Sequence, residues 1–319
     1  MNILIYGAGS VGVTFGTALV AGGENVTMLA RGESRKVMAD QGMGYSGVVG
    51  ARHVMPHQFK IIAALPSILS RTYDAILCCT KLSNLADWKD DILALTAANP
   101  DSRLVFMQNG WGVNAHFAHA VPSDRMVNAG IQLGITRKSA NLAEINSAGD
   151  PSDIGRIGLA DHDPVIDQLV ASVNVGGISC RFDADIGSAL WKKMLYNCTT
   201  NASSTLLNVP NGGLGGPDGR ALMGLLVDEI YAVIKALGYQ PPLPSAAAFA
   251  DLMVRDMLPL TAEHISSMLQ DRRHGKPTEI DFLNGAVVRV AEQFGVPCVA
   301  NKVIYHLVKM MTHSEDLKK

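Results

Sequence analysis

The first half of the chain alternates short apolar runs with segments of helical periodicity. The apolar runs predict strands at 3–6, 25–29, 75–80 and 103–108. The clearest helical pattern between them covers residues 11–21. Strands that alternate with helices are typical of βαβ units and a parallel sheet. Glycine and Asp-Pro turn signals accompany three further predicted strands and indicate a mixed edge to this sheet: 127–136, 143–146 and 156–159.

The pattern changes after residue 184, where strand signals almost vanish. Helical spacing predicts helices at 189–201, 219–237, 245–271, 278–294 and 300–312. The predicted fold class is therefore α/β, with an N-terminal Rossmann-type doubly wound sheet followed by a C-terminal all-α domain. The predicted domains are residues 1–184 and residues 185–319.

Composition narrows the class of protein without changing this picture. Of the 319 residues, 48% are hydrophobic and 18% are charged, which excludes disorder as the main state of the chain. The formal charge of -2 argues against a nucleic-acid partner and against a polybasic membrane anchor. No uncharged apolar stretch reaches 18 residues, so we expect no transmembrane helix.

The five cysteines and the N-terminal segment favour a cytoplasmic chain. The cysteines lack metal-type spacing, so we expect reduced packing residues and no metal site. The sequence starts with a predicted strand and not with a basic segment followed by a long apolar one, so no secretory leader is expected.

A glycine-rich turn follows the first predicted strand. Gly7, Gly9 and Gly12 fit the G-x-G-x-x-G pattern, and the turn opens a helix as a dinucleotide-binding loop requires. The first glycine permits the tight turn, the second lets a pyrophosphate approach the backbone, and the third lets the helix pack on the strand. Ser10 and Val11 then offer backbone N–H groups to the phosphates. The alternative is a glycine-rich turn without a ligand, which this context disfavours.

The end of the second predicted strand bears on the choice of cofactor. Sites specific for NAD place Asp or Glu there to bind the ribose 2′-OH. This chain has Arg31, with Arg35 and Lys36 nearby, and a guanidinium suits a 2′-phosphate. NADP(H) is therefore favoured. Glu33 is counter-evidence, and the alternative for Arg31 is an ordinary surface charge.

Polar residues follow two of the predicted buried strands. Lys81 comes after the strand at 75–80, and Asn109 comes after the strand at 103–108. Ligands of open α/β sheets bind outside the carboxyl ends of the strands, so both residues are candidates to line a cofactor or substrate cleft. The alternatives are a surface lysine and an Asn-Gly turn.

A polar stripe marks one predicted helix of the second half. Lys193, Asn197 and Asn201 are four residues apart and therefore share one helix face. Asn is unfavourable inside helices, so its repeated use on one face indicates a polar role. The alternative is a solvated polar face.

Further polar residues occur later in this half. Four of them fall on one predicted helix: Glu263, Ser266, Ser267 and Asp271. Thr278 would cap the next helix, and the helix dipole alone would favour Glu279 and Asp281 in its first turn. The pattern does not choose between these two carboxylates as a functional group.

These residues together resemble the ketopantoate reductase (2-dehydropantoate 2-reductase) family over nearly the whole chain. The resemblance rests on the glycine turn at 7–12, on Lys81 and on Asn109-Gly110. Its more specific parts are 190–193 with Asn197-Cys198 and Asn201, and 263–271 followed by 278–281 and Asn284-Gly285.

The resemblance implies an NADPH-dependent reduction of 2-dehydropantoate to pantoate, in pantothenate and coenzyme A biosynthesis. It also implies a helical substrate domain similar to the C-terminal domain of 6-phosphogluconate dehydrogenase. In the family, the lysine matching Lys193 is the general acid, and the glutamate matching Glu279 holds the hydroxyl end of the substrate. Substrate contacts are implied for Asn109, Asn197, Asn201 and Ser267. Cofactor contacts are implied for the glycine turn, Arg31, Lys81, Asn109 and Glu279.

Elementary chemistry supports a lysine as the acid. Hydride delivery to a ketone carbon builds negative charge on the oxygen, and an ammonium group can stabilise that charge and donate the proton. Two alternatives stay open, namely the reduction of another 2-oxo acid and a non-catalytic NADP(H)-sensing protein. The expected ligand is a small 2-oxo acid, with no nucleic-acid or membrane partner, and the oligomeric state stays open between a monomer and a homodimer.

Overall fold

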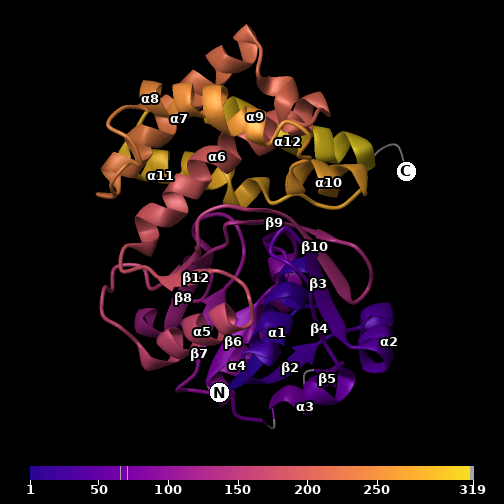
Figure 1. Ribbon diagram of the computed structural model, residues 1–319. Coiled ribbons are helices and arrows are strands. Elements are labelled where there is room, and N and C mark those ends of the chain that lie inside the picture. The colour runs from indigo at the N-terminus through magenta and orange to yellow at the C-terminus, as the bar shows by residue number, and fades with distance from the viewer. Residues whose placement is uncertain (65, 70, 317–319) are drawn as a thin grey trace. The chain divides into compact units, whose positions relative to one another are not determined.

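The computed structural model describes residues 1–64, 66–69 and 71–316. The chain divides into two compact units, which are coloured by residue number in Figure 1. The first consists of Met1–Gln108 with Val113–Ile186, and the second of Asn109–Gly112 with Gly187–Lys319. The short segment Asn109–Gly112 therefore leaves the first unit and packs with the helices of the second.

An eight-stranded sheet forms the centre of the first unit. Its strand order is β12-β11-β8-β7-β6-β1-β2-β5. The strands are β1 (Asn2–Tyr6), β2 (Asn25–Leu29), β5 (Lys60–Ile62), β6 (Ala75–Cys78), β7 (Arg103–Phe106), β8 (Met126–Gly130), β11 (Ser152–Gly155) and β12 (Cys180–Phe182). The pairings are parallel except that of β8 with β11. The predicted parallel sheet with a mixed edge is therefore confirmed.

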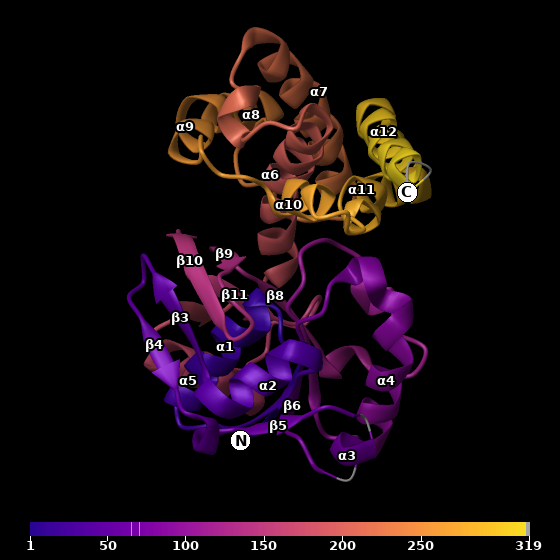
Figure 2. The same ribbon diagram turned by 90° about the vertical axis from the view of Figure 1, so that its right-hand side faces the viewer.

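Helices cover both faces of this sheet. They are α1 (Ser10–Ala21), α2 (Gly32–Gln41), α3 (Pro66–Leu69), α4 (Leu85–Ala98) and α5 (Pro164–Val175). Helices α1 and α5 lie side by side on one face, and α4 lies on the other (Figure 2). Buried apolar side chains of the strands and of α1 form one core, which includes Ile3, Ile5, Phe15, Met28 and Leu77.

A second sheet of four strands packs on α1 and was not predicted. Its order is β4-β3-β10-β9, with β3 (Met43–Gly47), β4 (Arg52–Val54), β9 (Leu133–Arg137) and β10 (Leu142–Ala148). The single strand predicted at 127–136 is wrong, because β8 belongs to the large sheet and β9 to this one. The strand predicted at 156–159 is not formed, and these residues make only an isolated bridge between Arg156 and Leu159. The nearest strand is β11, which ends just before them at Gly155.

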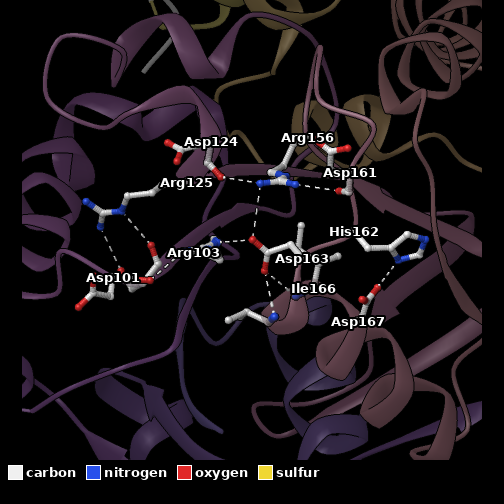
Figure 3. Close-up of polar contacts among 12 residues, drawn as sticks. Asp101, Arg103, Asp124, Arg125, Arg156, Asp161, His162, Asp163, Ile166 and Asp167 are labelled. Atoms are coloured by element: carbon white, nitrogen blue, oxygen red, sulfur yellow. Dashed lines mark hydrogen bonds and ion pairs between the residues drawn. The ribbon is translucent and has the colours of Figure 1, made fainter.

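A buried ion cluster joins the start of β7 to α5 (Figure 3). Asp163 caps α5 and accepts hydrogen bonds from Arg103 Nε at 2.7 Å and from the backbone N–H groups of Val165 at 2.9 Å and Ile166 at 3.3 Å. Arg156 Nη1 lies 3.6 Å from Asp163 Oδ2. Burial alone would raise the pKa of Asp163, but the bond and charge of Arg103 and the two N–H bonds lower this pKa overall.

The second unit is helical, as predicted. Its helices are α6 (Ile186–Leu207), α7 (Pro217–Ala236), α8 (Ala246–Leu252), α9 (Leu258–Leu260), α10 (Ser267–Arg273), α11 (Asn284–Phe294) and α12 (Val299–Asp316). A separate core lies between them and contains Trp191, Leu195, Leu226 and Ile230.

Two of the predicted helices differ from the observed ones. The segment 245–271 is not one helix. Helix α8, a π-helical turn at Met253–Met257 and α9 follow one another without a gap to Leu260, and α10 begins only at Ser267. The helix predicted from 278 begins only at Asn284, after a 3₁₀ turn at Ile280–Phe282. The expectation that Thr278 caps it is therefore wrong.

All five cysteines are free thiols. Within the described residues, no helix combines the length and the apolar character needed to cross a membrane.

Candidate functional site

Two glycines of the turn between β1 and α1 are required by the fold itself. Gly7 has a φ of +116°, and a Cβ there would lie 2.8 Å from Thr80 Cγ2. A Cβ on Gly12 would lie 2.0 Å from the carbonyl oxygen of Gly7, so the helix packs against the turn with no room for a side chain. These two positions need glycine whether or not a ligand binds.

Gly9 is different, because the chain itself would accept a side chain there. Its backbone is extended, and the nearest atom to a Cβ would be the Cys79 carbonyl oxygen at 3.8 Å, an ordinary contact. Gly9 is also the N-cap of α1 and gives it no side-chain cap, and the first turn, which starts with Ser10 and Val11, contains no acid. The turn therefore presents backbone N–H groups and an unfilled space, which fit a pyrophosphate.

Arg31 lies two residues beyond the end of β2, at the N-cap of α2. Its side chain is 66% exposed, and Nη2 lies 3.7 Å from Oδ2 of Asp91 on α4. Glu33, the counter-evidence noted in the sequence, is in the first turn of α2. Asp91 carries no local sequence signal, because only the packing of α4 brings it to the end of β2.

Lys81 lies three residues beyond the end of β6, which is two residues shorter than the predicted strand, and its side chain is exposed. Its carbonyl oxygen accepts a hydrogen bond from Trp88 Nε1 at 3.1 Å. The side chain of Gln108 donates to the carbonyl oxygen of Thr80 at 3.0 Å, which ties the end of β7 to the end of β6. Lys81 therefore stands at the carboxyl edge of the sheet, whereas Asn109 belongs to the second unit.

A small hollow in the second unit collects most of the remaining candidates. About 220 Å³ of space, open solvent included, lies between its lining atoms. Its lining consists of Asn109, Asn201, Ser267, Met268, Asp271, Glu279 and Leu283.

Asn109 reaches this hollow because the following residues pair with the 3₁₀ turn before α11. The backbone N–H of Trp111 donates to the carbonyl oxygen of Phe282 at 2.9 Å. Gly110 has a φ of +109°, and a Cβ there would lie 2.5 Å from the same oxygen. The Trp111 ring packs against Trp191 and Tyr239, with centroids 5.2 and 5.7 Å away, which anchors the segment.

Helix α6 supplies Asn201, whose side chain is buried. Lys193 and Asn197 lie on the same helix, about 12 Å and about 6 Å along its axis from Asn201. Both are half-buried. Within the described residues, the lining of the hollow includes Asn201 but neither of these two.

Helix α10 and the turn after it supply two carboxylates. Ser266 caps α10, accepting from the backbone N–H of Leu269 at 3.2 Å, and this places Ser267 and Asp271 one turn apart on the face that lines the hollow. Glu279 sits at the start of the 3₁₀ turn and is 9% exposed.

The structure separates Glu279 from Asp281, which the sequence pattern could not. The Asp281 side chain is 43% exposed and does not line the hollow. It accepts hydrogen bonds from Tyr305 Oη at 2.7 Å and from Lys309 Nζ at 3.0 Å. Glu279 is therefore the carboxylate that faces the hollow, and Asp281 ties α12 to the turn.

The charges around the hollow limit what it can bind. Asp271 and Glu279 are both buried carboxylates, so they disfavour a second anion between them and favour a hydroxyl group that donates to them. Asn109 and Asn201 add amide groups that can donate or accept. No group of three or more His, Cys, Asp or Glu among the described residues could hold a metal ion.

Family models match both units of the chain. The family described as ketopantoate reductase PanE/ApbA matches residues 3–157, and its C-terminal part matches residues 185–312. The chain belongs to the ketopantoate reductase family.

Two curated 2-dehydropantoate 2-reductases match this chain over nearly their whole length. The 2-dehydropantoate 2-reductase of Aquifex aeolicus is 25% identical over 311 residues, which cover 97% of this chain and 96% of that protein. The 2-dehydropantoate 2-reductase of Halobacterium salinarum is 27% identical over 312 residues, which cover 97% of this chain and 98% of that protein.

Solved structures share the fold. A PanE/ApbA family ketopantoate reductase from Ralstonia eutropha has a TM-score of 0.84 at 24% identity, with 99% of this chain and 100% of that chain covered. A D-mandelate dehydrogenase in complex with NADH and anilino(oxo)acetate has a TM-score of 0.82 at 21% identity, with 98% and 99% covered. The fold of ketopantoate reductases therefore also occurs in an enzyme named for a different substrate.

In this ketopantoate reductase family member, the hollow unites Asn109, Asn201, Ser267 and Glu279, four residues singled out from the sequence. Asp271 also lines the hollow, although the sequence placed it only in a polar cluster and not in the site. The spacing of four from Ser267 is the signal that could have placed Asp271 on the same helix face.

Proposed function

We propose that this protein reduces 2-dehydropantoate to pantoate with NADPH. The observation that carries the proposal is the hollow in the helical unit, where two buried carboxylates stand beside two asparagines and a serine. A 2-oxo acid with a hydroxyl group at its far end suits this site, because that hydroxyl can donate to Glu279 while the acid group stays away from the carboxylates.

The cofactor site of this proposal is the glycine turn with Arg31 and Lys81. NADPH, when bound, supplies the hydride. The open space at Gly9 and the N–H groups of α1 would hold the pyrophosphate, and the guanidinium of Arg31 would bind the 2′-phosphate. Two structural neighbours are complexes of D-mandelate dehydrogenase with NADH, so both cofactors belong in the test of this site.

Lys193 is the proposed general acid. Its ammonium group would stabilise the charge that develops on the keto oxygen and then donate the proton. Replacing Lys193 by alanine should lower kcat by about 10²–10⁴-fold while NADPH still binds, as measured by the loss of nicotinamide absorbance and by titration of cofactor fluorescence. Lys192→Ala is the control, because Lys192 is exposed on another face of the same helix. Equal turnover by the Lys193→Ala variant and the native chain would remove Lys193 from the mechanism.

The substrate is tested with a matched pair of 2-oxo acids. Trimethylpyruvate has the carbon skeleton of 2-dehydropantoate but lacks its hydroxyl group. We expect kcat/KM to be at least about tenfold higher for 2-dehydropantoate, because only this substrate can donate to Glu279. Equal rates, or a preference for an aromatic 2-oxo acid, would favour the alternative that the chain reduces another 2-oxo acid. Tight NADPH binding without turnover of any 2-oxo acid would favour an NADP(H)-sensing protein.

The proposed reaction belongs to pantothenate and coenzyme A biosynthesis in the cytoplasm. We also propose that the protein is a homodimer. Helices α11 and α12 border an apolar groove of about 460 Å³. The exposed apolar side chains on α12 are Val299, Val303, Leu307 and Met310. A structural neighbour is described as a dimeric ketopantoate reductase from Staphylococcus aureus. Sedimentation of the native chain and of Val303→Glu should give a dimer and a monomer, and a monomeric native chain would overturn this assembly.

A further inference from the structure

The carboxyl end of β1 carries a buried phenol that binds a carboxylate from α4. Tyr6 is the last residue of β1 and pairs with Leu29 of β2 on one side and with Cys78 of β6 on the other. Its ring is buried, and its hydroxyl donates a hydrogen bond to Oδ2 of Asp91. Burial, and then the bond to Asp91, raise the pKa of Tyr6, so the phenol stays protonated and keeps donating at neutral pH.

The same carboxylate oxygen also faces Arg31. Arg31 Nη2 lies 3.7 Å from Asp91 Oδ2, which is ion-pair distance without the geometry of a tight bidentate pair. The Asp91 side chain is 25% exposed and the Arg31 side chain 66% exposed. Tyr6 thus fixes the carboxylate from the interior of the unit, and Arg31 approaches it from solvent.

A site that only had to bind a 2′-phosphate would not need this carboxylate. A phosphate is favoured by the guanidinium and disfavoured by any nearby anion. In dinucleotide sites that bind NAD, the acidic residue that binds the ribose stands at the end of β2. In this chain that position is Arg31, and the acid arrives instead from α4, in contact with the arginine.

We propose that Asp91 is a specificity-determining residue, which limits the preference for NADPH over NADH by pairing with Arg31 in competition with the ribose 2′-phosphate. The proposal rests on the cofactor site proposed above. NADPH must break the Asp91–Arg31 ion pair, and its 2′-phosphate must then lie near the negative charge of Asp91. NADH has no 2′-phosphate, so it neither breaks the Asp91–Arg31 pair nor is repelled by Asp91.

The size of the effect follows from Coulomb's law. A carboxylate roughly 6 Å from a dianionic phosphate, in a water-like dielectric, weakens phosphate binding by about tenfold. The hydrogen bond from Tyr6 withdraws part of the charge of Asp91 from Arg31, so it reduces the competition. Removing Asp91's charge and removing the Tyr6 hydroxyl should therefore act in opposite directions.

The first test compares dissociation constants of NADPH and NADH for the native chain, Asp91→Asn and Asp90→Asn. Asp90 is the exposed neighbour on α4 and makes the same change in net charge. We expect Asp91→Asn to tighten NADPH about tenfold and to change NADH less than about twofold, while Asp90→Asn leaves the ratio of the two constants within about twofold of the native value. Competition with adenosine 2′,5′-bisphosphate and with adenosine 5′-monophosphate should reproduce the same change in ratio.

The second test uses Tyr6→Phe, which keeps the ring and removes only the hydroxyl. We expect NADPH to bind about threefold more weakly, with NADH unchanged. A merely structural role would make both variants bind both cofactors more weakly, with the ratio unchanged, and that result would overturn the proposal. An unchanged ratio in Asp91→Asn would overturn it as well. A native chain that binds neither cofactor would instead refute the proposed function, so the two failures are distinguishable.

Discussion

Buried carboxylates occur in both units, and Asp163 of the first can be compared with Asp271 and Glu279 of the second. Asp163 is enclosed by donors, with Arg103, Arg156 and two backbone N–H groups within 3.6 Å of its oxygens. Asp271 and Glu279 line the hollow of the second unit. A buried carboxylate therefore does not mark a ligand site by itself, and the proposed function adds the neighbouring hollow as a second criterion.

Position in the fold gives the same distinction. Arg103 is the first residue of β7, so the Asp163 cluster lies at the amino end of this strand. Ligands of open α/β sheets bind at the carboxyl ends of the strands. The cluster in Figure 3 accordingly serves the stability of the first unit, and its loss should not affect chemistry in molecules that remain folded.

The largest expected effect is on stability, from Asp163→Ala. This change leaves the charges of Arg103 and Arg156 without their buried partner and removes the cap of α5. We expect the free energy of unfolding to fall by about 3–5 kcal/mol, with kcat/KM of the folded fraction unchanged. Urea unfolding followed by circular dichroism, with activity measured on the folded protein, tests both parts.

Asp167→Ala is the control for this change. Asp167 lies on the same helix, and its side chain is 44% exposed and 2.9 Å from His162. An exposed pair contributes little, so we expect a loss below about 1 kcal/mol. If the two substitutions destabilised the chain equally, the distinction between a saturated buried carboxylate and an exposed one would fail here.

Glu279→Gln should have the reverse effect of Asp163→Ala, lowering activity and leaving stability nearly unchanged. Glutamine keeps the shape of the side chain but loses the negative charge that, in the proposed function, accepts the substrate hydroxyl. We expect kcat/KM for 2-dehydropantoate to fall about 100-fold, equivalent to about 2.7 kcal/mol, with a change in stability below about 1 kcal/mol. With trimethylpyruvate, which lacks the hydroxyl, the variant and the native chain should have similar rates.

Asp281→Asn is the matched control, two residues away in the same turn. Its carboxylate binds Tyr305 and Lys309 and does not line the hollow, so we expect activity within about twofold of native and a modest loss of stability. If Asp281→Asn lost as much activity as Glu279→Gln, the assignment of the hollow to the substrate hydroxyl would be wrong.

The alternation of strands and helices was predictable because each element is specified locally. Strand β2 coincides with the predicted 25–29, and α1 begins one residue before the predicted helix. The four-stranded sheet was not predictable in this way, because β3 pairs with β10 across about a hundred residues and β4 is only three residues long. Helix α11 likewise starts where Asn284 can donate to the carbonyl oxygen of Cys198 at 3.0 Å, a tertiary contact.

The candidate site was likewise predictable only in part. Spacing along one helix predicts that Lys193, Asn197 and Asn201 share a face, and of these three Asn201 lines the hollow. It could not show that Asn109 joins the helical unit, because that depends on the bond between Trp111 and Phe282. It could not find Asp91 either, since this residue meets Arg31 only through the packing of α4.

The smallest expected effect is the change in the free energy of unfolding on acid titration, which tests Asp163 alone. Burial opposes ionisation of Asp163, but its donors outweigh burial and lower its pKa below the usual 3.8 in the folded chain. A carboxylate whose pKa is lowered by folding stabilises the folded state fully above its unfolded pKa, and this contribution is lost as the pH falls through the folded pKa. The stability advantage of the native chain over Asp163→Asn should therefore be constant between about pH 7 and about pH 5 and should shrink below pH 3.8. Urea unfolding of both proteins over this pH series measures the difference. An advantage that grew as the pH fell would mean that the arginines do not hold the carboxylate ionised, and the contrast between the two regions would lose its electrostatic basis.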